Sequence, residues 1–161
     1  MNVKALDTLS SHFPITAPMP VLFIGHGSPL NAIEQNEFSK GWANITTEIP
    51  TPSAIICISA HYETVGTHIT AAAAPKTIHD FYGFPPALFN TIYQAPGSPI
   101  LASATKKLVT ETDVILDNNW GLDHGSWSIL KNMYPLAKIP VLEMSLDTRL
   151  TPYAISTLRT P

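Results

Sequence analysis

The sequence has little cysteine and few basic residues. Cys57 is the only cysteine among 161 residues, so an internal disulfide is excluded. A lone cysteine within an apolar run is typical of a reducing compartment, and we expect a cytoplasmic protein. The nine lysines and arginines are spread along the chain, and the formal net charge is −3. This composition offers no basic surface for nucleic acid, and no nucleic-acid partner is expected.

Long apolar runs are also absent. The longest, such as residues 54–60, are much shorter than the roughly 20 residues that a membrane-spanning helix needs, so no membrane partner is expected. Residues 1–19 lack the apolar core of a secretory signal, and we expect them to form an irregular leader. Residues 20–161 are long enough to bury a core, and we expect one catalytic domain there.

Short apolar segments alternate with helical patterns along the chain. The segments typical of strands are 21–24, 54–59, 68–73, 114–116 and 140–145. The continuous apolar run 54–59 is typical of a strand covered on both faces. Helices are expected within 29–47, 98–111 and 127–134. This order predicts an α/β domain with a central, largely parallel or mixed sheet flanked by helices.

Two histidines directly follow apolar segments. His26 comes between two glycines after residues 21–24, and His61 comes after the run 54–59. In a parallel sheet both would emerge at the same edge, and neighbouring strands lie about 4.8 Å apart, so two imidazoles could reach one metal ion. Two imidazoles with one further ligand suit Fe(II) or Zn(II). Two independent loop histidines remain the alternative, because a pair so distant in the chain is not a local metal motif.

Other polar residues point to other chemistry. His124 lies between two tryptophans, where an imidazole can serve as a general acid or base or can simply pack. Ser28 and Ser126 each follow a His-Gly pair, but neither lies in the G-x-S-x-G turn of a serine hydrolase. Ser28 instead suits the N-cap of a helix. A phosphate-binding loop is disfavoured because the lysine of a P-loop is missing.

Five motifs together resemble one family. They are GHGSP at 25–29, SAHY at 59–62, TIHDFYGFP at 77–85, YQAPGSP at 93–99 and WGLDHGSW at 120–127. In this order the motifs resemble the DOPA-type extradiol ring-cleavage dioxygenases, which are class III, or LigB-like, aromatic ring-opening dioxygenases. The resemblance implies a non-haem metal, with Fe(II) for catalysis and Zn(II) as an alternative bound metal. It also implies O₂ as co-substrate and insertion of both oxygen atoms into a catechol such as DOPA.

The resemblance also implies roles for individual residues. His26 and His61 match the two N-terminal metal ligands of the family. His124 matches an active-site histidine, which we assign to hydrogen bonding or proton transfer and not to the metal. The candidates for the substrate pocket are Ser28, His79, Phe81, Tyr82, Phe84 and Asp123. Several of them lie in the long aromatic connection 75–97, and loops of this length are usually functional.

Family members of this type extend beyond the end of this chain. The resemblance implies a later histidine in a V-V-H-N segment and a third metal ligand near the C-terminus. Every histidine here lies at or before position 124, so we expect the C-terminal part of the fold to be missing. Two hypotheses follow: an extradiol catechol dioxygenase, or an inactive, truncated remnant that binds metal weakly. The sequence leaves the oligomeric state open.

Overall fold

The computed structural model describes residues 17–150, so most of the expected leader 1–19 lies outside the described residues. The elements in chain order are a 3₁₀ helix η1 (Pro29–Ala32), α2 (Glu37–Glu48), β1 (Ile55–Thr64), β2 (Thr67–Thr70), α3 (Pro86–Phe89), α4 (Pro99–Leu108), β3 (Val114–Asp117), α5 (His124–Met133) and β4 (Val141–Asp147). Within the described part, no helix is long and apolar enough to cross a membrane.

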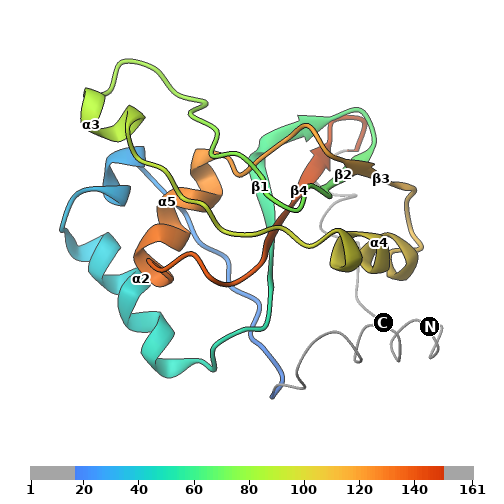
Figure 1. Cartoon of the computed structure of the whole chain (residues 1–161), viewed down its shortest axis with the longest axis horizontal. Coiled ribbons are helices and arrows are strands. Elements are labelled where there is room, and N and C mark those ends of the chain that lie inside the picture. The colour runs from blue at the N-terminus through green and yellow to red at the C-terminus, as the bar shows by residue number, and fades with distance from the viewer. Residues whose placement is uncertain (1–16, 151–161) are drawn as a thin grey trace.

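The strands form one mixed sheet in the order β1-β4-β2-β3. β1 pairs with β4 in parallel, β2 pairs with β3 in parallel, and β2 and β4 run antiparallel. Figure 1 shows α2 and α5 on one side of the strands and α4 on the other. The predicted α/β domain with a central sheet is confirmed.

Two apolar clusters hold the helices on the sheet. Successive residues of β4 point to opposite faces, so Val141 and Leu142 belong to different clusters. Val141 packs with Trp127 and Leu130 of α5, and Leu142 packs with Ala102 of α4. These contacts fix the first turn of α5 beside β1, which is the arrangement that builds the site.

The predicted strand over residues 21–24 is wrong. The chain is irregular there, and the side chains of Val21 and Phe23 are almost fully exposed. An isolated strand gains no ladder of hydrogen bonds, and β1 is the edge strand of the described sheet with β4 as its neighbour. Residues 21–24 are therefore apolar in sequence but form no strand in the structure.

The prediction that residues 54–59 form a strand covered on both faces is also wrong. The strand forms, but Ile58 is 68% exposed and Ile56 is 43% exposed. Both pair with residues of β4 on the face that α4 covers, but the main strand contacts of α4 are with β2 and β3. The outer part of this face therefore stays open within the described residues.

The ends of two elements differ from the expectation in ways that matter for the site. β1 continues to Thr64, so His61 lies inside the strand, within an irregular stretch of its pairing with β4. Helix α5 begins at His124 and not at 127, because Asp123 caps it by accepting a hydrogen bond from the Ser126 amide (3.3 Å). His124 is consequently a residue of the first helical turn.

Candidate metal centre

Three histidines from distant parts of the chain meet in one cluster. The ring centroids of His26 and His61 are 4.8 Å apart, those of His26 and His124 are 5.0 Å apart, and those of His61 and His124 are 4.1 Å apart. The Nε2 atoms of His26 and His61 lie 2.8 Å from each other. The predicted convergence of His26 and His61 is thus present in the structure, although it does not arise from two paired strands.

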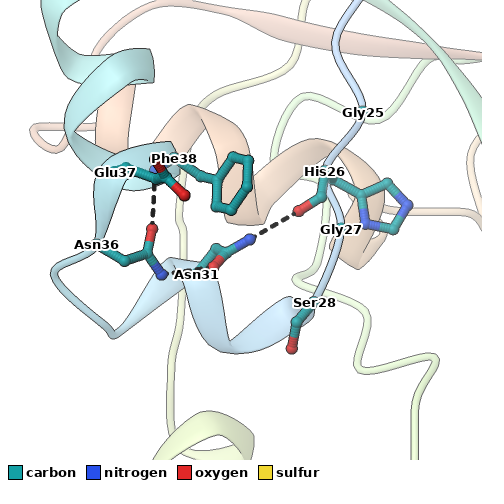
Figure 2. Close-up of a pocket in the computed structure, with 8 residues that line it drawn as sticks. All are labelled: Gly25, His26, Gly27, Ser28, Asn31, Asn36, Glu37 and Phe38. Carbon is teal, nitrogen blue, oxygen red and sulfur yellow. Dashed lines mark hydrogen bonds between the residues drawn. The ribbon is translucent and has the colours of Figure 1, made fainter.

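The turn after His26 fixes the first imidazole. Gly27 has φ +61°, a conformation that favours glycine. Ser28 then caps η1 by accepting a hydrogen bond from the Leu30 amide (3.3 Å), as its sequence pattern predicted. The Asn31 side chain donates to the His26 carbonyl (3.1 Å), as Figure 2 shows. These contacts hold a residue that has no regular secondary structure of its own.

His61 lies directly against the first turn of α5. A Cβ atom at Gly125 would come 2.7 Å from Cδ2 of His61 and 3.2 Å from Oγ of Ser59. The Ser59 hydroxyl accepts a hydrogen bond from the His61 amide (3.2 Å). Glycine at position 125 is therefore what allows the imidazole of β1 to approach the helix so closely.

Asp80 contacts two of the three histidines. Its Oδ1 accepts a hydrogen bond from the His124 backbone amide (3.0 Å) and lies 2.9 Å from Nδ1 of the same residue. The ring nitrogen is at hydrogen-bonding distance but is poorly aligned, so the contact is best described as an electrostatic one. The other oxygen, Oδ2, lies 3.8 Å from Nδ1 of His61.

The surroundings favour neutral imidazole at His26 and an ionised carboxylate at Asp80. Burial lowers the pKa of His26 below its ordinary 6.5, and the neighbouring His124 and His61 lower it further. Burial raises the pKa of Asp80, but its contacts with the side chain and backbone of His124 outweigh burial and leave that pKa below its ordinary value. A neutral imidazole keeps the lone pair that a metal ion requires.

The donor set fits a transition-metal ion. One ligand atom from each of His26, His61 and His124 lies within 4.8 Å of the others. Imidazole nitrogen is a normal ligand for iron and zinc. Among the described residues, buried Nδ1 of His26 has no hydrogen-bond partner, so this polar atom of the cluster is unsatisfied. The geometry also brings His124 within ligand reach, a position that the sequence interpretation assigned to proton transfer.

The predicted substrate-pocket residues separate into several places. Ser28 lines a pocket of about 410 Å³ together with Asn36, Glu37 and Phe38. His26 also lines this pocket, but Figure 2 shows its imidazole directed away from Asn36, Glu37 and Phe38.

The aromatic connection supplies the wall of the cluster. The Phe81 ring lies edge-on to His124 at 5.6 Å, and Phe84 packs on Phe81 at 5.4 Å. Tyr82 between them is 91% exposed. Nε2 of His79 lies 2.8 Å from the Thr91 carbonyl, and this histidine packs on Trp127.

The expected tryptophan neighbours of His124 are replaced. Trp120 stacks on Tyr62 at 4.7 Å with an interplanar angle of 3°, and Trp127 is buried in the core. Both tryptophans lie close to His124 in the sequence, but the first turn of α5 directs Trp127 away from the ring of His124. The aromatic ring next to His124 is Phe81 from the long connection.

Sequence reasoning missed a buried acidic pair beneath the cluster. Asp123 and Glu143 are both fully buried, and Glu143 accepts hydrogen bonds from the Asp123 amide (2.9 Å) and from Nε1 of Trp120 (3.1 Å). Burial and the nearby Asp123 carboxylate raise the pKa of Glu143 well above its ordinary value. A single glutamate inside the apolar strand pattern 140–145 was the available signal.

Comparison with known proteins places the chain among enzymes of one type. The profile described as the catalytic LigB subunit of aromatic ring-opening dioxygenase matches residues 8–158. A 4,5-DOPA dioxygenase extradiol from Escherichia coli (strain K12) is 50% identical over 131 residues, covering 81% of this chain and 48% of that protein. A 4,5-DOPA dioxygenase extradiol from Beta vulgaris is 40% identical over 134 residues, covering 80% and 50%.

A solved structure agrees with these sequence matches. The crystal structure of an uncharacterized protein from Escherichia coli K12 superimposes with a TM-score of 0.66 at 40% identity. The match covers 83% of this chain and 49% of that protein. The chain thus spans about half the length of the curated relatives that it matches.

Proposed function

Because the chain belongs to the LigB family of aromatic ring-opening dioxygenases, we propose that it opens the ring of a catechol such as DOPA with O₂, beside the two hydroxyls. The observation that carries the proposal is the convergence of His26, His61 and His124. Each of the three histidines lies in one of the five motifs that resemble the extradiol enzymes. The names of the relatives favour the same substrate class.

In this proposal His26 and His61 hold the metal, which is Fe(II) during catalysis, with Zn(II) as an alternative occupant. The bound metal would bring catechol and O₂ together and lower the pKa of the phenol. The protein contributes two imidazoles on rigid supports. One is held by the turn at Gly27 and the other by β1 against Gly125.

His124 acts next to the metal in this proposal. Its Nδ1 lies beside Asp80, so Nε2 is the nitrogen left to exchange a proton or hydrogen bond with a catechol hydroxyl. The ring of Phe81 borders His124 and, with Phe84, offers an apolar wall for the substrate ring. Water excluded at this wall would strengthen the polar contacts within the site.

The other pocket candidates support these groups or border the site. Asp123 caps the helix that carries His124, and His79 braces the aromatic connection through its contact with Thr91. Ser28 caps η1 beside His26, and exposed Tyr82 is placed to meet substrate from outside. We also propose a cytoplasmic location, which rests on the single unpaired cysteine.

The test is turnover by the chain loaded anaerobically with Fe(II). Addition of DOPA and O₂ is expected to give a yellow ring-opened product with matching O₂ uptake. His26→Ala and His61→Ala are expected to abolish the product. His68→Ala is the matched control, because His68 lies outside the cluster beside Asp117. Absence of turnover with every catechol tested, or turnover unaffected by His26→Ala, would contradict the proposal.

The second candidate is the inactive remnant with weak metal binding. It is favoured by one observation, that the chain covers only about half of its relatives. Catalytic zinc sites normally use three protein ligands, and two histidines alone would bind metal weakly. The remnant predicts substoichiometric metal and no product in the same assay, whereas the enzyme predicts stoichiometric metal and a ring-opened product.

A further inference from the structure

We propose that Asp80 is a positioning residue, which keeps the ring proton of both His61 and His124 on Nδ1 and leaves both Nε2 atoms free. The inference rests on the proposed metal-dependent function and adds a residue to it. The single carboxylate of Asp80 lies beside both rings. Its Oδ1 is 2.9 Å from Nδ1 of His124, and its Oδ2 is 3.8 Å from Nδ1 of His61.

The chemistry of the two groups sets the direction of this effect. A neutral imidazole carries its proton on one nitrogen and a lone pair on the other, and an ionised carboxylate only accepts hydrogen bonds. A carboxylate beside Nδ1 therefore favours the Nδ1–H form of each ring. In His61 the remaining nitrogen, Nε2, is the one that lies 2.8 Å from Nε2 of His26. The lone pair on Nε2 of His61 then faces the site proposed for the metal ion.

The backbone around Asp80 is held firmly enough for this role. Residues 76–78 pair with Leu122, through Ile78 N to Leu122 O (2.7 Å) and Leu122 N to Lys76 O (2.8 Å). Nε1 of Trp127 donates to the Ile78 carbonyl (2.8 Å). A Cβ atom at Gly121 would come 2.0 Å from the Lys76 carbonyl oxygen, so this pairing needs glycine there. Asp80 follows directly from a segment fastened to the start of α5.

The isosteric variant Asp80→Asn separates positioning from simple bracing. The amide oxygen can replace Oδ1 and still accept from the His124 backbone amide, which keeps the structural contact. The amide NH₂ then occupies the place of Oδ2 and donates towards Nδ1 of His61. This reversal favours the proton on Nε2 of His61, where it blocks metal binding.

The test combines the ring tautomers with metal affinity. Long-range ¹H–¹⁵N spectra of the metal-free chain, recorded at a pH of about 8, distinguish the protonated nitrogen of each histidine. We expect His61 and His124 as Nδ1–H forms in the parent and His61 as the Nε2–H form in Asp80→Asn. We expect Asp80→Asn to bind Co²⁺, a spectroscopic substitute for Fe(II), about 10- to 100-fold more weakly.

Asp117→Asn is the matched control. Asp117 also lies beside a histidine, with Oδ2 3.9 Å from Nδ1 of His68, but away from the cluster. It is expected to leave the Co²⁺ affinity and the spectra of His61 and His124 unchanged. Unchanged tautomers in Asp80→Asn, or an unchanged Co²⁺ affinity, would overturn the inference. If the parent binds no Co²⁺, the proposed metal site fails, while the spectra of the metal-free chain still decide the role of Asp80.

Discussion

At the scale of single residues, the absence of a side chain at Gly125 is as important as the imidazoles. A Cβ atom there would lie 2.7 Å from the ring of His61, within a contact that neither β1 nor α5 can easily relax. We expect Gly125→Ala to lower the free energy of unfolding by about 1–3 kcal/mol, as overpacking does. It should also weaken Co²⁺ binding, because the ring of His61 must move. Urea denaturation and Co²⁺ titration measure the two effects.

Gly41→Ala is the control for this substitution. Gly41 lies within α2, and an added Cβ there would meet no atom of residues 17–150 within 4 Å. Alanine in a helix interior is expected to raise the free energy of unfolding by roughly 0.5–1 kcal/mol and to leave Co²⁺ binding unchanged. Equal effects of the two substitutions would show that the close approach of His61 to Gly125 is not real.

His26 makes stability depend on pH in a defined direction. Its folded pKa lies below the ordinary 6.5, so the unfolded chain binds more protons in the window between the two values. The stability that this residue contributes is full above a pH of about 6.5 and is lost as the pH falls through the lowered pKa. The imidazole of folded His26 loses its lone pair as the pH falls through the same lowered pKa, so metal binding should weaken there.

The difference between the parent and His26→Gln isolates this contribution. We expect the unfolding free energy of the parent to fall more steeply than that of the variant when urea denaturation is repeated from about pH 8 down to about pH 5. Groups away from the histidine cluster titrate alike in both proteins and cancel in the difference. Identical pH profiles would mean that His26 is not shifted by its neighbours.

At the scale of elements, the start of α5 depends on its cap. Asp123 is fully buried and accepts the hydrogen bond from the Ser126 amide, which allows the helix to begin at His124. Asp123→Ala is expected to cost about 1–2 kcal/mol of unfolding free energy. Asp123→Asn keeps a capping oxygen and should cost clearly less. Urea denaturation of both variants checks this, and an equal loss in the two would exclude capping as the cause.

The sequence predicted the elements that carry their own signals. Ser98 and Pro99 mark the start of α4, and the apolar runs that became β3 and β4 lie close to their expected positions. The failure at residues 21–24 has a physical reason. A strand is stabilised by its neighbours, and an apolar sequence does not show whether a neighbour is present.

At the scale of the whole molecule, the sequence singled out the three histidines that the structure brings together, but not how they are held. His26, His61 and His124 stood out through their motifs. Asp80 and Gly125 did not, because their importance comes from contacts between segments distant in the chain. The buried Glu143 is similar, since its partners Trp120 and Asp123 lie on another element. Contacts of this kind are decided by tertiary packing, which a local pattern does not contain.

The fold nevertheless assembles the cluster from the described residues alone. β1, the first turn of α5 and the turn after His26 meet where the three imidazoles cluster, and the aromatic connection borders them with Phe81 and Asp80. The account therefore predicts that this chain binds a metal ion through residues that it contains, whatever the contribution of the further length found in its relatives.

Metal stoichiometry tests that claim most directly. Anaerobic equilibrium dialysis of the purified chain against Fe(II), with Co²⁺ as a stable substitute, measures the ions bound per chain. We predict one ion per chain in the parent, loss of that ion in both His26→Ala and His61→Ala, and its retention in His68→Ala. No bound ion in the folded parent, or an ion that survives the removal of His26 and of His61, would contradict the account.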